Sequence, residues 1–518
     1  MNKIKLMKRK FKIIAISITA LLIVRVCLSN EKKKDDAIKL NSTKNLIKVN
    51  ITSTLNSKSI PVNSKVFGVN IGFAFATELD KDSGFVQLLR AMHPATLRFP
   101  GGTVGNYYHP NSPVYGFKSN EIMPSLIPLY NQQSKRSENI LYNFIRLSKA
   151  IGSGAVFCAN LLNGTIEETM FVLDELTKNN IPIYGVELGN EFVLLPYREK
   201  IFTSADVYTQ KVKATADAIS AKYPSIKIAV VAGDDVPENE NNSRSRFMQE
   251  WNQKLSKQSY FDAYVWHYYP GCESCDKNTF FDSISLLNLQ QLAPFRTKKL
   301  DNASNRFSKL YGKERKLWLT EWNVGNGKFL ESTFAQGAFV YEQFLNIIDI
   351  NTKNNNLIEI TNLHHLLGLI NPYKGKQASV LSIQNYQATA QYFAFKFLAT
   401  TLDSTAYRAA EQITCVDKTV KDNFVCNTFY KQTTKTTYLH YINRSGKPIE
   451  LTINVPINSP INITSVDAKA PYASAGKTGF EKDYPNKLTP IKLRNDVLNT
   501  NTISIAPYSF GYISYQAK

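Results

Sequence analysis

Two kinds of hydrophobic pattern alternate along most of the chain. Short runs rich in β-branched and aromatic residues are separated by longer stretches in which apolar residues recur every three or four positions. The first pattern is typical of buried strands and the second of amphipathic helices. A series of strands, each followed by a helix, predicts a (β/α)8 barrel over residues 61–402. Its strands are expected at residues 65–73, 95–100, 154–162, 181–188, 226–233, 261–268, 316–322 and 358–367.

The pattern changes after residue 402. From there to the C-terminus, polar and apolar residues alternate with a period of two, and no helical pattern interrupts them. This alternation predicts an antiparallel β-sandwich over residues 403–518. Residues 46–60 open with a similar β pattern, LIKVNITST, and we expect them to add a strand to that sandwich. The expected fold class is therefore α/β, a TIM barrel with a C-terminal antiparallel β-sandwich domain.

The N-terminal residues 1–27 resemble an export signal. Six Lys or Arg residues precede the apolar run IIAISITALLIV (13–24), which is too short to span a bilayer comfortably. Cys27 follows this run and offers an alternative, attachment to a membrane through a lipidated N-terminal anchor. Residues 28–45 are polar and Lys-rich, as expected of a linker. We expect a protein that is secreted, periplasmic or anchored to the cell surface.

Export permits disulfide bonds. Cys415 and Cys426 lie in the strand-rich C-terminal region and are expected to bridge a hairpin. Cys272 and Cys275 form the stretch GCESC, which supplies two ligands where structural zinc needs four. A short disulfide or two free thiols are therefore expected there, rather than a metal site. Cys158 falls in an apolar run and is expected in the core.

The formal net charge is +20 at pH 7, and the first 36 residues contribute a large share, with ten Lys or Arg against three acids. The rest is spread thinly through a Lys- and Asn-rich chain. No block of arginines and no nucleic-acid motif is present, so we expect no nucleic-acid partner. Two interpretations of the charge stay open, a drift in composition and attraction to an anionic substrate or surface.

Two acids occur where barrel enzymes have their active sites, at the C-terminal ends of the strands. The fourth predicted strand ends in Asn190 and Glu191, and the seventh ends in Glu321. One glutamate at a strand end is usually a solvated surface group. Two that face each other across a barrel mouth are what glycoside hydrolysis requires, one to protonate the leaving oxygen and one to attack the anomeric carbon. For retention, the carboxyl groups lie about 5–5.5 Å apart.

Glu187 precedes Glu191 by four residues and shares its strand face by parity. We expect Glu187 to point into the barrel and pair with a buried base, for which Arg98 at the end of the second strand is a candidate.

The sixth strand ends in a histidine and two tyrosines, which as isolated residues are more often packing groups than catalytic ones. Candidate sugar-stacking faces are the aromatic residues next to these strand ends, namely Trp322, Tyr268 and Phe192.

The pair ELGNE (187–191) and TEW (320–322) resembles clan A of the glycoside hydrolases, which are retaining (β/α)8 enzymes. LRFPGG (97–102), WHYYP (266–270) and APYSFGYISY (506–515) resemble the family 51 α-L-arabinofuranosidases of that clan. The resemblance covers most of the chain from about residue 46. It implies that the glutamate of the fourth strand is the acid/base and that of the seventh the nucleophile.

The same resemblance implies roles for the surrounding residues. Asn190 would bind the hydroxyl next to the anomeric carbon. Tyr269 or Tyr268 would donate a hydrogen bond to the nucleophile, and His267 would orient the acid/base. Arg98 would keep the nucleophile ionised. The resemblance implies no cofactor and no metal, and its partner is a carbohydrate substrate.

Three positions depart from the family pattern. Gly72, Thr103 and His365 stand where the family has a glutamate, an asparagine and a glutamine. The expected function is retaining hydrolysis of a plant or environmental polysaccharide or oligosaccharide, similar to α-L-arabinofuranosidase. Because sugar contacts differ, a heparanase- or β-glucuronidase-like hydrolase of an anionic glycan is the alternative, since that group also carries ELGNE. A non-catalytic carbohydrate- or polyanion-binding surface protein is the alternative of another class.

Overall fold

The structure is a computed structural model that describes residues 46–52, 60–71, 79–112, 116–133, 138–195, 197–237, 239–270, 298–325, 333–366, 370–372, 386–415, 422–454, 459–473 and 491–516. The expected signal or anchor, the linker, Gly72, Cys272 and Cys275 lie outside these residues. Within them, no helix combines the length and the apolar character needed to cross a membrane.

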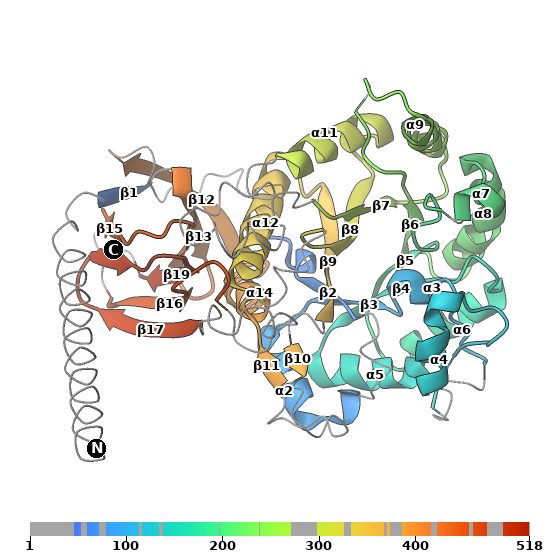
Figure 1. The fold of residues 1–518 in the computed structure, drawn as a ribbon, viewed down its shortest axis with the longest axis horizontal. Helices are drawn as coiled ribbons and strands as arrows, with labels where there is room; N and C mark the ends of the chain where they lie inside the picture. The colour runs from blue at the N-terminus through green and yellow to red at the C-terminus, as the bar shows by residue number, and fades with distance from the viewer. Residues whose placement is uncertain are drawn as a thin grey trace, which may run out of the picture.

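Eight parallel strands close into a barrel in the order β2 to β9, which confirms the expected fold class (Figure 1). Each strand overlaps one of the expected strand segments. Their bounds are Gly68–Asn70 (β2), Thr96–Phe99 (β3), Gly154–Cys158 (β4), Ile183–Glu187 (β5), Lys227–Val231 (β6), Ala263–Tyr268 (β7), Lys316–Trp322 (β8) and Ile358–His364 (β9).

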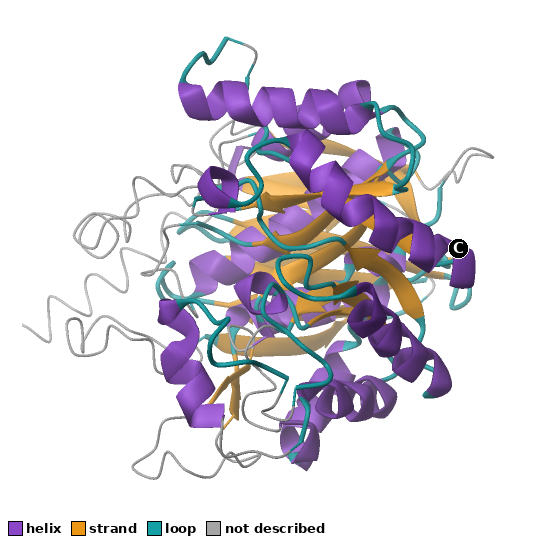
Figure 2. Ribbon diagram, turned by 90° about the vertical axis from the view of Figure 1, so that its right-hand side faces the viewer, coloured by secondary structure: helices purple, strands orange, loops and turns teal. Residues whose placement is uncertain are grey.

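Helices surround the barrel on its outside, and Figure 2 shows the strands enclosed by them. The helices with apolar faces turned to the sheet are Ser83–Met92 (α2), Ile140–Ile151 (α5), Ile166–Lys178 (α6), Ala205–Lys222 (α8), Ser243–Ser256 (α9), Lys299–Tyr311 (α11), Phe334–Lys353 (α12) and Ala390–Thr401 (α14). Shorter elements in the connections are Gly102–Gly105 (α3), Ile127–Gln133 (α4), Tyr197–Lys200 (α7) and the strand pair Ile370–Pro372 (β10) and Tyr386–Ala388 (β11).

Side chains fill the interior of the barrel. Trp318 on β8 is fully buried there and donates from Nε1 to Glu359 at 3.1 Å. Gly185 on β5 leaves room for this ring, because a Cβ at that position would come within 2.1 Å of it. The remaining interior cluster is small and aliphatic, formed by Val156, Ala229, Ala263, Val265 and Ile360. The barrel is therefore a packed core whose ionisable groups lie at the strand ends.

The C-terminal domain is a nine-stranded sheet, and β1 lies inside it between β12 and β15. β1 (Leu46–Thr52) pairs antiparallel with β12 and parallel with β15, so the strand expected at residues 46–60 joins this sheet. The other strands are Ala406–Cys415 (β12), Phe424–Lys431 (β13), Thr436–Asn443 (β14), Ile449–Ile453 (β15), Ile461–Asp467 (β16), Lys492–Leu498 (β17), Thr502–Ile505 (β18) and Ser509–Tyr515 (β19).

The expected bridge between Cys415 and Cys426 is wrong, because Cys426 is a free thiol. Cys426 is buried in the apolar core of the C-terminal sheet, in a cluster that also contains Leu439 and Ile513. Its backbone pairs with Tyr441 on β14. β12 and β13 pair over Ala406–Ala409 and Thr428–Lys431, away from both cysteines. Cys158, expected in the core, is buried.

Candidate active site

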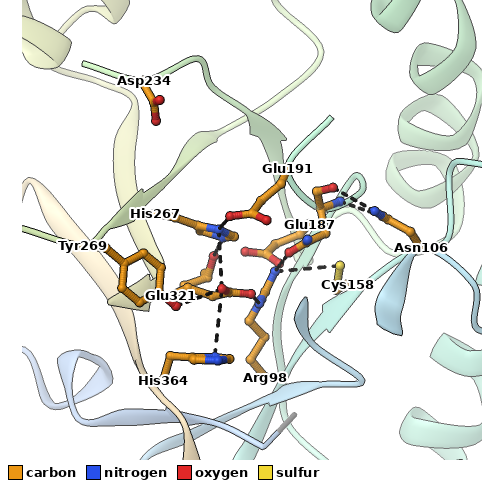
Figure 3. A network of polar contacts seen from close by, with 12 residues as sticks. Arg98, Asn106, Cys158, Glu187, Glu191, Asp234, His267, Tyr269, Glu321 and His364 are labelled. Carbon is orange, nitrogen blue, oxygen red and sulfur yellow. Dashed lines mark hydrogen bonds and ion pairs between the residues drawn. The ribbon is translucent and has the colours of Figure 1, made fainter. Parts of the chain in front are cut away.

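Ionisable side chains from four barrel strands meet at the C-terminal mouth of the barrel (Figure 3). Arg98 comes from β3, His267 from β7, Glu321 from β8 and His364 from β9. Glu191 follows β5 in the loop that leaves the barrel. The sequence analysis expected Arg98, Glu191, His267 and Glu321 at strand ends but did not single out His364, and the closed sheet brings all five into one cluster.

Glu191 and Glu321 face each other. One carboxylate oxygen of each, together with a ring nitrogen of His267, lie within 4.8 Å of one another. This closest approach fits the spacing of about 5–5.5 Å typical of retaining glycosidases and is shorter than the 6.5–9.5 Å of inverting ones. The side chain of Glu191 is 29% exposed and that of Glu321 only 8%. Glu191 is therefore the more accessible acid.

Arg98 forms ion pairs with both Glu187, deep in the barrel, and Glu321, at its mouth. Its side chain is fully buried, and its guanidinium donates at 2.6 Å to both Glu187 and Glu321. A third hydrogen bond, 2.8 Å long, runs to Oδ1 of Asn190. Glu187 thus lies inside the barrel and is paired with the base expected from the sequence. Burial opposes the charge of Arg98, but the two carboxylates raise its pKa above the usual range.

Glu321 is held in its ionised form. Burial acts against ionisation, but the charges of His267 and Arg98 outweigh it and hold the pKa of Glu321 well below its usual range. Arg98 donates to one carboxylate oxygen, and the Tyr269 hydroxyl donates to the other at 3.0 Å. Both oxygens are thus fixed, and the carboxylate is ionised at neutral pH.

His267 lies between the two glutamates. Its Nδ1 is 2.9 Å from Oε1 of Glu191 and 3.7 Å from Oε2 of Glu321. Its other nitrogen, Nε2, is 3.4 Å from the Thr320 hydroxyl. Burial tends to lower the pKa of His267, but the carboxylates of Glu321 and Glu191 raise it overall. His267 can therefore exchange a proton with Glu191 through a direct hydrogen bond.

Two hydrogen bonds between the side chain of Asn106 and the backbone of Asn190 fix the loop that carries Glu191. The side chain of Asn106, which follows α3, donates to the backbone oxygen of Asn190 at 2.8 Å and accepts from its N–H at 3.0 Å. The next residue, Glu191, has a positive φ of 53°, a conformation that non-glycine residues adopt rarely and that is frequent at functional sites. Nδ2 of Asn190 is buried without a hydrogen-bond partner and remains available as a donor.

Tyr268 and Tyr269 have opposite orientations. Tyr269 points to Glu321, whereas Tyr268 is 1% exposed and packs against Trp266 with ring centroids 5.3 Å apart. Burial and the nearby carboxylate of Asp301 on α11 raise the pKa of Tyr268. Of the two tyrosines, only Tyr269 contacts the nucleophile candidate, and Tyr268 has no access to substrate.

The other two stacking candidates are wrong for the same reason. Trp322 is fully buried, donates to Thr361 at 3.2 Å and packs on Phe344 of α12. Phe192 is fully buried against Phe202, with ring centroids 4.2 Å apart. Neither ring can meet a sugar.

His364, rather than His365, is the histidine of β9 nearest the nucleophile candidate. Its Nδ1 lies 3.9 Å from Oε2 of Glu321, and burial lowers its pKa. Burial, reinforced by the neighbouring His364, also lowers the pKa of His365, to about 4. Both imidazoles are therefore neutral at pH 7.

A cavity of about 400 Å³ opens beside Glu191. Residues at the C-terminal ends of β6 and β7 and in the loops after β5 and β6 line it, and it includes the ion pair of Asp234 with Arg244. Glu191, His267 and Glu321 also lie close enough to one another to hold a metal ion. However, Arg98 and Tyr269 already occupy both oxygens of Glu321. The geometry suits proton transfer and nucleophilic attack.

Sequence reasoning missed Asn106 and Asp234. Asn106 follows LRFPGG by four residues, and no pattern in the sequence distinguishes it from its neighbours. Asp234 and Asp235 directly follow the predicted fifth strand, so a search of every strand end for acids finds them.

The sequence matches no family model, and a comparison with curated proteins finds no match. Solved structures are similar. An α-L-arabinofuranosidase from Thermotoga maritima in complex with arabinose superposes with a TM-score of 0.60 at 15% identity, over 91% of this chain and 99% of that one. A family 51 α-L-arabinofuranosidase from Bifidobacterium longum gives 0.62 at 12% identity, over 91% and 100%.

A 4-O-α-L-rhamnosyl-β-D-glucuronidase from Fusarium oxysporum superposes with a TM-score of 0.52 at 14% identity, over 90% of this chain and 100% of that one. At such identities the similarity is one of fold. At that level, the resemblance to family 51 and related clan A glycoside hydrolases is confirmed.

Proposed function

We propose that the protein is a retaining glycoside hydrolase that acts on a polysaccharide or oligosaccharide, similar to α-L-arabinofuranosidases. One observation carries the proposal. A partly exposed glutamate, Glu191, and a buried ionised one, Glu321, approach within 4.8 Å at the mouth of a TIM barrel. This is the arrangement that double displacement at an anomeric carbon requires.

In the first step, an oxygen of Glu321 attacks the anomeric carbon, and the glycosidic C–O bond breaks. Glu191 gives its proton to the departing oxygen, so the leaving sugar departs as a neutral alcohol. A glycosyl ester on Glu321 remains. In the second step, Glu191 removes a proton from water, the water oxygen attacks the anomeric carbon, and Glu321 is released as a carboxylate.

Neighbouring residues prepare each acid for its task. Arg98 and Tyr269 hold Glu321 ionised and oriented, and they take up the charge when the ester breaks. His267 orients Glu191 and exchanges a proton with it. The free Nδ2 of Asn190 can donate to the sugar hydroxyl next to the reacting carbon.

One observation favours the anionic-glycan alternative. His364 and His365 lie on the nucleophile side, where a carboxylate on the sugar would promote their protonation. The positive net charge of the chain would also attract such a substrate. A glucuronide should then be hydrolysed faster than a neutral glycoside, with a preference that grows as the pH falls.

The test is a set of nitrophenyl glycosides, including arabinofuranoside, glucuronide, xyloside and galactoside, assayed with wild type and matched variants. Glu321→Gln should lose nearly all turnover, by about 10³-fold or more. Glu191→Ala should lose less with activated aryl leaving groups, and azide should restore part of its rate. Glu167→Gln, at an exposed glutamate on α6, is the control.

A non-catalytic binding protein predicts a different result. Wild type would release no nitrophenol from any glycoside, and both catalytic-pair variants would keep carbohydrate binding unchanged. Hydrolysis that survives both substitutions at wild-type rates would equally overturn the assignment of the two glutamates.

A further inference from the structure

The cavity beside Glu191 lies on one side of the catalytic pair. Glu191, His267 and Tyr269 line it, whereas Glu321 is not among its described lining residues. In Figure 3, Asp234 and His364 lie at opposite ends of the site, with Glu191 toward Asp234 and Glu321 toward His364. Since the acid protonates the leaving oxygen and the nucleophile contacts the retained sugar, the leaving sugar belongs on the side of Asp234.

The lining of the cavity suits a sugar ring. A volume of about 400 Å³ is within the range of small-ligand sites. Apolar and polar groups contribute almost equally, as needed for a ring with C–H faces and hydroxyl edges. Val231, Val265 and Trp266 are among the apolar residues, and Asp234, Arg244 and Lys299 are among the polar ones.

Acidic side chains along this cavity are paired with basic ones. Asp234 pairs with Arg244, and Asp235 pairs with Arg306 through a 2.7 Å hydrogen bond. Burial raises the pKa of Asp234 in spite of Arg244 and Lys299 nearby, so this carboxyl lies in a sheltered environment. Paired acids and bases offer hydrogen-bond acceptors and donors without a net cationic field, which favours a neutral hydroxylated ligand over an anionic one.

We propose that this cavity is the subsite for the leaving-group sugar, and that Asp234 and Arg244 determine specificity there by binding its hydroxyls. The inference rests on the proposed function. The side chains are 35% and 54% exposed, so each retains hydrogen-bonding capacity toward a ligand. Asp234 accepts from a sugar hydroxyl, and Arg244 donates to one.

A second cavity supports a glycan as the occupant. It has about 310 Å³, lies between α9 and α11, and shares Asp234, Asp235 and Val236 with the first cavity. Gln249, Gln253 and Arg306 add polar groups to it. A leaving group longer than one sugar would pass over the shared residues and find further hydrogen-bonding partners, whereas a compact aryl group would use none of them.

The experiment compares two leaving groups on one glycone, the sugar that the nitrophenyl screen identifies. One substrate is its 2,4-dinitrophenyl glycoside, and the other is a disaccharide in which it is linked to xylose, galactose or glucose. Asp234→Asn and Arg244→Met are measured against Lys254→Met, which breaks an exposed ion pair with Asp206 away from the cavity. Exposed ion pairs contribute little to stability, so all three variants should fold.

We expect kcat/KM for the disaccharide to fall roughly three- to tenfold in each cavity variant, as for the loss of one hydrogen bond. The dinitrophenyl glycoside should stay within about twofold of wild type, because its leaving group needs neither protonation nor hydroxyl contacts. Free xylose, galactose or glucose added to the dinitrophenyl reaction should accept the glycosyl group in wild type and less so in the variants.

Equal effects on both substrates, or no effect on either, would overturn this inference while leaving the proposed function intact. A wild-type protein that releases no dinitrophenol from any glycoside would overturn the proposed function, and the subsite with it. Lys254→Met should match wild type throughout, and a loss of disaccharide activity there would count against a role specific to the cavity.

Discussion

The guanidinium of Arg98 lies between two carboxylates that have different tasks. Glu187 lies deep in the barrel and forms one ion pair with Arg98. Glu321 lies at the barrel mouth and forms the other. The three side chains are almost entirely excluded from water, so each charge depends on the others for compensation. Glu187 therefore fixes the position of Arg98, and Arg98 in turn holds the ionised carboxylate of Glu321 in place.

Replacing Arg98 by Met should damage both folding and chemistry. Two buried carboxylates would remain without a cation, which costs about 3–5 kcal/mol of the free energy of unfolding. The pKa of Glu321 would rise, so the nucleophile would become protonated at a higher pH, and the acidic limb of kcat/KM would move to higher pH. Urea unfolding and a pH–rate profile measure the two effects.

The double variant Arg98→Met with Glu187→Gln separates these effects. Removal of the second charge should return a large part of the lost stability, because only one carboxylate remains. Catalysis should stay impaired, since Glu321 still lacks its cation. Full recovery of activity in the double variant would show that Arg98 acts only as a structural residue.

Some orientations of single residues follow from strand parity. Successive side chains on a strand point to opposite faces, so His267 facing the barrel places Tyr268 toward the helices. On β8 the pairing register shifts before Trp322, so Trp318 and Glu321 both face inward although they are three residues apart. Parity thus predicted the depth of Glu187, and it could also have removed Tyr268 from the stacking candidates, but not Trp322. Phe192 follows the positive φ of Glu191, and parity does not extend past the end of a strand.

At the scale of elements, the strand pattern was strong enough to place every strand of the barrel. Each is a short apolar run bounded by polar residues, and the helices between them show clear periodicity. The pair of hydrogen bonds between Asn106, which follows α3, and Asn190 in the loop after β5 was not predictable. Asn106 and Asn190 are 84 residues apart, and their pairing depends on the closure of the barrel. Likewise, the spacing of Cys415 and Cys426 says nothing about hairpin register.

A buried histidine links elements of the two domains. His440 on β14 lies 2.5 Å through Nδ1 from the hydroxyl of Tyr341 on α12, and its Nε2 lies 3.1 Å from the hydroxyl of Thr401 on α14. Tyr341 also donates to the backbone oxygen of Gly511 on β19. Burial lowers the pKa of His440 to about 3. This network therefore requires a neutral imidazole.

Stability should depend on pH through His440. An unfolded histidine titrates near 6.5, so its contribution is complete above that pH and is lost as the pH falls toward about 3. Each unit of pH in this window costs up to about 1.4 kcal/mol. In His440→Gln the free energy of unfolding should fall less between pH 6.5 and 4 than in wild type. Guanidinium unfolding at several pH values measures this difference.

The control for that series is His93→Asn, at an exposed histidine in the left-handed cap position of α2. Asparagine tolerates this conformation, so folding should be retained. His93→Asn should show the wild-type pH slope. Identical slopes in His440→Gln and wild type would contradict the assignment of this titration to the interface between the domains.

At the scale of the whole molecule, the sandwich supports the barrel. Figure 1 shows the C-terminal sheet against α12 and α14, the last two long helices of the barrel. Arg408 reaches Asp349 at 2.9 Å, and Arg444 reaches Glu342 at 2.9 Å, both across this interface. β1 precedes the barrel in sequence and lies inside the C-terminal sheet. The chain therefore enters and leaves the barrel through one domain, which holds the last barrel helices in place behind β8 and β9.

The proposed double displacement requires that Glu321 become covalently attached to the sugar. A 2-deoxy-2-fluoro glycoside with a dinitrophenyl leaving group should trap that ester, because the fluorine slows both its formation and its hydrolysis, and the good leaving group restores the rate of formation alone. Peptide mapping by mass spectrometry should then find the fluoro sugar on the peptide that contains Glu321, and no label in Glu321→Gln. A label on Glu191, or none in a protein that hydrolyses the parent glycoside, would contradict the account.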